Sequence, residues 1–140
     1  MFLIDSNIFL EYFLGQKRGD EVRTFFDSVP NENLFVTDFS VHSCGVILFR
    51  NKKANLWIEW INLIKSTSGI DVLEIEMHRK KDLLSAHEVQ SLDFDDAYQY
   101  VVAKTENLHL VSFDQDFDKT DLKRLEPLQA VELWKNRGAV

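Results

Sequence analysis

The chain has 140 residues, of which 45% are hydrophobic, and its 16 basic and 23 acidic side chains give a formal net charge of −7. This length and composition fit one folded domain and exclude a disordered chain. The negative charge excludes nucleic-acid binding through bulk positive charge, so a phosphate ligand would need local neutralisation, which a bound divalent cation could supply.

The first half of the chain alternates predicted strands and helices. A short apolar run ends at Asp5, and "DSNIFLEYFLG" then has helical spacing, with Asp5 or Ser6 near its N-cap and Gly15 near its end. The run "NLFVT" is rich in strand-forming residues and precedes a helix with Asp38 as its predicted N-cap. The predicted order is a strand at 2–5, helices at 5–15 and 20–29, a strand at 33–37, and helices at 38–51 and 52–69.

The second half continues the same alternation. The predicted order is a strand at 70–75, helices at 76–90 and 93–107, a strand at 108–113, a turn at 114–119 and a short final strand, "LQAVEL", at 128–133. Strands that alternate with helices along a whole chain predict an α/β fold, a three-layer arrangement with a mainly parallel sheet flanked by helices on both faces. We expect residues 1–140 to form a single domain of this kind.

Carboxylates occur where these elements should meet at one edge of the sheet. Asp5 ends the first strand, Asp114 follows the fourth, and Asp96 lies at the start of the helix before the fourth strand. Ligands of open parallel sheets bind beyond the carboxyl ends of the strands, and pairing of the first and fourth strands would bring these acids together. Such carboxylates repel one another unless they are protonated or bridged by a cation, and hard oxygen ligands suit Mg²⁺ or Mn²⁺.

Each aspartate also has a purely structural interpretation. Asp93 and Asp96 fit the cap and the first turn of a helix. Asp116 and Asp118 fit a turn, and Asp5 fits a helix cap. Two strand-end acids together with a helix-start acid are nevertheless more specific than any one of them. The combination predicts a metal centre that could act on a phosphodiester.

Three segments that carry these acids, "FLIDSNIFLEYF", "LDFDDAYQYVVA" and "LHLVSFDQDF", resemble the PIN-domain family, and within it the VapC-type toxins of toxin–antitoxin pairs. The resemblance implies a Mg²⁺- or Mn²⁺-dependent endoribonuclease that cleaves RNA, dimerises and is inhibited by a small antitoxin protein. By the same resemblance, the metal ligands fall on Asp5, Asp96 and Asp114. The other matching positions are Asp116, a further acidic position with a catalytic role, and Asn7 and Ser112, which are polar positions near the acids.

The chain departs from the family pattern on the helix after the second strand. The family has a glutamate there, and the position aligns with Ser43, which carries no charge. The acid nearest in sequence is Asp38, about a turn away. Asp116 or Asp95 could compensate for the missing charge, and His42 could contact a phosphate or a metal.

This departure leaves a second function open, in which the chain is a catalytically weakened PIN-like module that binds RNA or a protein. A third candidate is a metal-dependent phosphatase on a similar sheet. An aspartyl-phosphate mechanism requires a second acid two residues after the nucleophile, whereas Asp5 is followed by Ser6 and Asn7. The ribonuclease therefore remains the leading interpretation.

Further features bear on location and partners. The apolar runs are too short to span a membrane, and the first residues lack the basic segment of a signal peptide. The lone Cys44 fits a reducing compartment, so we expect a cytoplasmic protein without membrane association. Phe49, Trp57 and Trp60 could form an exposed hydrophobic surface for a partner, although such residues more often lie in the core. In VapC-like proteins the corresponding helix pair contacts the antitoxin.

Overall fold

The computed structural model describes residues 1–65 and 69–138, and its centre is a parallel sheet with the strand order β3-β2-β1-β4. The strands are β1 (Phe2–Ile4), β2 (Leu34–Thr37), β3 (Asp71–Leu73) and β4 (His109–Val111). Phe2 lies opposite His109 and Ile4 lies opposite Val111, which confirms the predicted pairing of the first and fourth strands. The carboxyl ends of these two strands therefore lie side by side.

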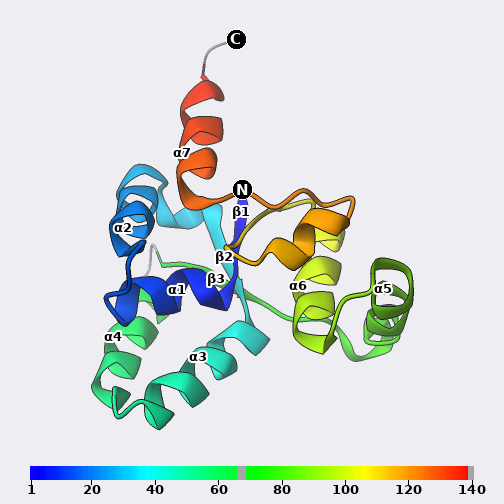
Figure 1. Ribbon diagram of the computed structural model, residues 1–140, viewed down its shortest axis with the longest axis horizontal. Helices are drawn as coiled ribbons and strands as arrows, with labels where there is room; N and C mark the ends of the chain where they lie inside the picture. The colour runs from blue at the N-terminus through cyan, green and yellow to red at the C-terminus, as the bar shows by residue number, and fades with distance from the viewer. Residues whose placement is uncertain (66–68, 139–140) are drawn as a thin grey trace.

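Helices cover both faces of this sheet, as the alternating pattern predicts (Figure 1). The helices are α1 (Ser6–Phe13), α2 (Gly19–Ser28), α3 (Asp38–Arg50), α4 (Ala54–Lys65), α5 (Asp82–Gln90), α6 (Phe94–Thr105) and α7 (Pro127–Asn136). Three short 3-10 helices complete the described elements: η1 (Asn31–Asn33), η2 (Met77–Arg79) and η3 (Gln115–Lys119). The helices α5 and α6 pack on one face, whereas α1, α2, α3, α4 and α7 contribute to the core on the other.

Strand β1 shows how the sequence divides the core in two. Successive side chains of a strand point to opposite faces. Phe2 and Ile4 accordingly join the core cluster that contains Trp60, whereas Leu3 joins the cluster under α5 and α6. All three side chains of β1 are fully buried. The predicted fold class is confirmed, and none of the described helices is long and apolar enough to cross a membrane.

The predicted final strand at 128–133 is wrong, because these residues form the first turns of α7. Pro127 occupies the start of the helix, where its fixed φ angle is favourable and its missing N–H costs nothing. The Gln129 side chain accepts a hydrogen bond from the Glu126 backbone N–H at 2.8 Å, which completes the helix start. The chain does pair with the sheet, but only at Leu125, which forms an isolated parallel bridge with Val111.

Two other local predictions need correction. The N-cap of α3 is Thr37 rather than Asp38, since the Thr37 hydroxyl accepts from the Ser40 N–H at 3.0 Å. The predicted helix at 76–90 is divided into η2 and α5. Of the predicted helix at 52–69, residues 54–65 form α4, and residues 66–68 lie outside the described part of the chain.

The tryptophans of α4 are part of the core, which is the more common of the two placements that the sequence left open. Trp60 is fully buried and Trp57 is partly buried against it, with ring centroids 5.5 Å apart. Phe49, on the neighbouring helix α3, remains 60% exposed. The exposed large hydrophobic side chains of this helix pair are Val46 and Phe49 on α3 and Ile58 on α4.

Gly45→Ala is expected to destabilise the protein, because Gly45 lies where α3 meets α4. A β-carbon at this position would lie 2.9 Å from the Trp57 ring, which is itself packed against Trp60 and Phe49. Overpacking of this kind costs about 1–3 kcal/mol in the free energy of unfolding, which urea denaturation would measure. Gly138→Ala is the matched control, since a β-carbon there meets nothing within 4 Å. Equal stability of the two variants would contradict the expectation.

Candidate functional site

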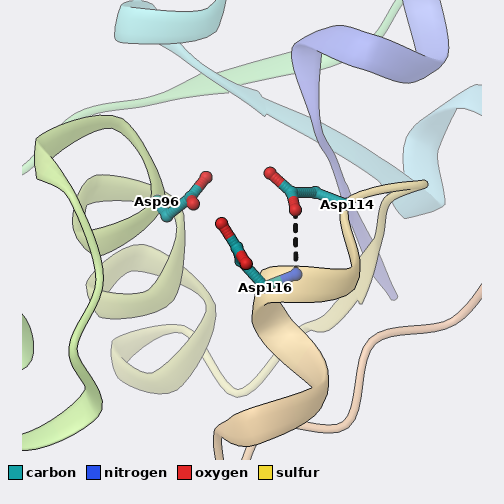
Figure 2. Close-up of side chains that lie close together, drawn as sticks. All are labelled: Asp96, Asp114 and Asp116. Carbon is teal, nitrogen blue, oxygen red and sulfur yellow. Dashed lines mark hydrogen bonds between the residues drawn. The ribbon is translucent and has the colours of Figure 1, made fainter.

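Three carboxylates converge at the carboxyl edge of the sheet. Asp96 lies in the first turn of α6, whereas Asp114 caps η3 and Asp116 lies within it. One oxygen from each carboxylate lies within 4.8 Å of an oxygen from the other two. Figure 2 shows the three side chains pointing toward one another from the two elements. We call these three residues the acidic cluster.

Aspartate side chains cap both elements that carry the acidic cluster. The Asp114 carboxylate accepts a hydrogen bond from the Asp116 N–H at 2.8 Å, drawn as the dashed line in Figure 2, and so caps η3. Asp93 caps α6 by accepting from the Asp96 N–H at 3.0 Å, which confirms its predicted role as a cap. The acidic cluster is therefore carried by the capped starts of α6 and η3.

The charges of the acidic cluster oppose one another in the absence of a cation. Burial raises the pKa of Asp96 to about 7, and the neighbouring carboxylates of Asp114, Asp93, Asp5 and Asp116 contribute to that rise. A divalent cation would relieve this repulsion, and three carboxylate oxygens are the donors that Mg²⁺ and Mn²⁺ prefer. The residues present therefore fit such an ion.

Asp5, Asp96 and Asp114 line a cavity of about 300 Å³, which we call the acidic cavity. The Asp5 carboxylate already has several hydrogen-bond donors. It accepts from the Ser6 N–H and the Ser112 hydroxyl, both at 2.7 Å, and from the Asn7 amide at 3.1 Å. Burial raises the pKa of Asp5, and the bonds from Ser112 and Ser6 oppose that rise. Asp5 thus organises the floor of the cavity, whereas the close carboxylate contacts are made by the acidic cluster.

Ser112 and Asn7, both predicted as supporting residues, connect Asp5 to the acidic cluster. The Ser112 hydroxyl donates to Asp5 and accepts from the Asp114 N–H at 2.9 Å. The Asn7 amide group donates to Asp5 and to Ser112, each at 3.1 Å, and its oxygen accepts from the Phe113 N–H at 3.2 Å. These bonds hold the ends of β1 and β4 in one rigid arrangement.

A hydrogen-bonded network of buried polar side chains beside Asp5 was not predicted from the sequence. The Gln99 amide contacts the Ser40 hydroxyl and lies 3.5 Å from the Asp5 carboxylate. Ser40 also accepts from the Thr37 hydroxyl at 3.1 Å, and all three polar residues are buried. The available signal was a glutamine three residues after Asp96, and therefore on the same face of the helix.

The remaining candidates divide between the cavity and the surface. Ser43, at the family's glutamate position, lines the acidic cavity, and so does Asp95. Burial and the Asp93 charge raise the pKa of Asp95. His42 is exposed, does not line the cavity, and places its Nδ1 atom 2.7 Å from the Asp38 carbonyl oxygen. The Asp38 carboxylate is bound by the Tyr98 hydroxyl at 2.8 Å.

Comparison with known proteins agrees with this architecture. A family model described as PIN domain matches residues 2–123. No curated protein sequence matches the chain. Among solved structures, Mycobacterium tuberculosis VapC20, described as a toxin that cleaves the sarcin–ricin loop, has a TM-score of 0.76 at 16% identity over 91% of this chain and 100% of that one.

Two further structures have the same fold. A toxin–antitoxin complex from Klebsiella pneumoniae has a TM-score of 0.72 at 16% identity, over 91% of this chain and 98% of that one. FitAcB from Neisseria gonorrhoeae has a TM-score of 0.66 at 19% identity, over 91% of this chain and 99% of that one. At such identities the likeness concerns the fold.

Proposed function

Because the chain belongs to the PIN domain family, we propose that it is a divalent-metal-dependent endoribonuclease that hydrolyses phosphodiester bonds of RNA. The observation that carries the proposal is the acidic cluster beside the buried Asp5, at the edge of the sheet where ligands of parallel α/β folds bind. Mg²⁺ or Mn²⁺ is the proposed ion, and RNA is the proposed substrate.

The residues of the site have distinct proposed roles. Asp96, Asp114 and Asp116 supply the oxygens that hold the ion, with Asp5 beside them as the buried fourth acid. When bound, the ion supplies positive charge that lowers the pKa of water and stabilises charge developing on the phosphate oxygens. Ser112 fixes the Asp114 loop through its bond to the Asp114 N–H, and Asn7 fixes Phe113. A bound ion would favour the ionised form of Asp96.

The biological setting that we propose is a toxin–antitoxin pair, with this chain as the toxin, a cytoplasmic single-domain protein that forms a homodimer. Two of the solved structures with the same fold are the toxin–antitoxin complex from Klebsiella pneumoniae and the toxin VapC20 from Mycobacterium tuberculosis. The exposed Phe49, Val46 and Ile58 on α3 and α4 offer a hydrophobic surface for a small antitoxin protein.

One observation favours the second candidate, a weakened module that binds RNA or a protein. Ser43 lines the acidic cavity with a hydroxyl, so the site has one charge fewer than the family pattern implies. A crystal soaked in Mn²⁺ separates the two functions. Anomalous density between Asp96 and Asp114 supports the nuclease, and an empty cluster at millimolar Mn²⁺ supports the module.

Cleavage by the wild-type protein tests the proposal directly. A fluorescent single-stranded RNA pool should be cut in millimolar Mg²⁺ or Mn²⁺ and remain intact in EDTA, because the acidic cluster cannot supply positive charge to the phosphate. Gel electrophoresis of the products measures the rate. Restoration of cutting when Mn²⁺ is added in excess of EDTA is the control for protein integrity. Equal cutting with and without EDTA would contradict metal dependence.

A further inference from the structure

A second cavity, of about 510 Å³, adjoins the acidic cavity. The two share Asn7, Leu10 and Ile47 in their walls, so they lie side by side along α1 and α3. The second cavity also contains Phe113, the residue immediately before Asp114, and extends to Arg18. A polymer cleaved at the acidic cluster would therefore have a neighbouring unit at or near this cavity.

Arg18 forms a rigid planar surface in the second cavity. Its guanidinium carbon lies 4.2 Å from the centre of the Phe113 ring. Its nitrogens donate to both oxygens of Glu21, at 3.0 and 2.8 Å, and to Glu126 at 2.7 Å. Two carboxylates thus compensate its charge and fix its orientation, while the side chain remains 35% exposed. Arg18 therefore offers a flat face rather than a free positive charge.

The position of this surface relative to the acids is also fixed. The Phe113 N–H donates to the Asn7 side chain, and the same side chain donates to Asp5. Phe113 directly precedes Asp114, so their α-carbons lie about 3.8 Å apart. We call Arg18 and Phe113 the stacking pair.

From this arrangement we infer that the second cavity is a nucleobase subsite, in which an unpaired base next to the scissile phosphate stacks on the stacking pair. Aromatic rings and arginine planes are the surfaces on which proteins stack unpaired bases. Ligand cavities of about 300–1,000 Å³ combine such apolar walls with a few polar groups, here the amides of Asn7, Gln16 and Asn51. Glu11 also lines the cavity, and its carboxylate accepts a hydrogen bond from the Arg18 backbone N–H at 2.8 Å.

Two exposed lysines are sequence neighbours of residues that line the second cavity. Lys17 precedes Arg18, and Lys52 follows Asn51, the C-cap of α3. The chain is acidic as a whole, so local lysines matter more here than the net charge. The inference rests on the proposed ribonuclease function and adds to it a preference for single-stranded RNA with a base at one defined position.

An abasic substitution tests the subsite. The cleavage site in a fixed 12-nucleotide RNA is mapped first, and the base on each side of the cut is then removed in turn. Loss of the stacked base should lower the wild-type kcat/KM about tenfold at one of the two positions, the range expected for stacking. In Phe113→Leu and in Arg18→Lys the same removal should cost less than about threefold, because the partner surface is already lost.

Matched variants separate stacking from general damage. Phe26→Leu alters a partly buried phenylalanine of the same core cluster that lines neither cavity. Arg79→Lys alters an arginine with an i,i+3 ion pair like that of Arg18 and Glu21. Both should keep the full tenfold abasic penalty, and circular dichroism melting confirms folding of all four variants. An equal penalty in every variant, or a penalty at neither position in the wild type, overturns the subsite.

Binding keeps this test independent of cleavage. Fluorescence anisotropy in EDTA compares the 12-nucleotide RNA with a fully abasic strand of the same length. The wild type should prefer the intact strand at least tenfold, and the stacking-pair variants should lose most of that preference. A wild type that prefers the intact strand but cuts nothing contradicts the nuclease and retains the subsite. A wild type that cuts RNA but shows no such preference retains the nuclease and overturns the subsite.

Discussion

Asp96→Asn is expected to lower RNA cleavage on the order of a hundredfold or more and, at pH 8, to stabilise the metal-free protein. Asp96 contributes one of three carboxylates whose oxygens lie within 4.8 Å of one another, and an amide provides no charge to hold the ion. Metal stabilisation of a phosphoryl transition state is worth several kcal/mol, and about 1.4 kcal/mol corresponds to a tenfold rate change. Product formation in saturating Mn²⁺ measures the loss.

The stability change follows from the raised pKa of Asp96. Its folded-state pKa of about 7 exceeds the ordinary value of 3.8, so between these values the folded state binds more protons than the unfolded state. The contribution of Asp96 to folding is therefore present at low pH and is lost as pH rises toward 7, by at most about 1.4 kcal/mol per pH unit. The asparagine side chain that replaces it carries no charge, so the variant avoids this loss.

Urea denaturation in EDTA at pH 5 and pH 8 measures the effect. The variant should be the more stable of the two at both pH values, and its advantage should be clearly larger at pH 8 than at pH 5, because pH 5 lies near the start of the window between 3.8 and about 7. Asp27→Asn, at an exposed position on α2, is the matched control and should show no such divergence. A wild type that is as stable as Asp96→Asn at pH 8 would mean that the cluster is not strained without an ion.

The fold could be predicted because its determinants are local. Short apolar runs ending in polar residues define β1 and β4, and their burial on both faces indicates a parallel sheet. The error at α7 has an equally local cause. "LQAVEL" is a short, mostly apolar run that periodicity alone does not assign to a strand or a helix. Pro127 and the Gln129 side chain start a helix two residues after the chain leaves its bridge at Leu125, so these helix-start signals decide the structure.

The site was predicted only as far as the topology defines it. Strand ends and a helix start place Asp96 and Asp114 together, because parallel pairing brings those ends to one edge. The topology does not determine the conformations of the side chains, and these conformations decide which other groups meet at the site. Asp116, which the family resemblance indicates as a further acid, points into the cluster, and the Asp5 carboxylate accepts a hydrogen bond from Ser112. The contact of Gln99 with Ser40 joins residues 59 positions apart, and no sequence pattern on α6 indicates such a partner.

Ser43→Glu is expected to raise Mn²⁺ affinity roughly tenfold, about 1.4 kcal/mol, and to increase cleavage at low Mn²⁺. Ser43 lines the acidic cavity together with Asp96 and Asp114, so a carboxylate on this side chain would add charge where the ion is proposed to bind. Affinity of oxygen-ligand sites rises with the number of charged ligands. The same added charge should destabilise the metal-free protein at pH 8, because it increases the repulsion that already raises the pKa of Asp96.

His42→Glu provides the matched control for this substitution. It adds the same charge one residue earlier on α3, but His42 is exposed and outside the cavity, so Mn²⁺ affinity should not change. Titration calorimetry with Mn²⁺ measures both variants against the wild type. A gain in Mn²⁺ affinity in Ser43→Glu alone would show that the wild-type site binds the ion but has too little negative charge. Such a site would explain nuclease activity that is weak but not lost. Equal affinity in all three proteins would mean that position 43 does not reach the ion, and that Asp116 already supplies the charge for which the family uses its glutamate.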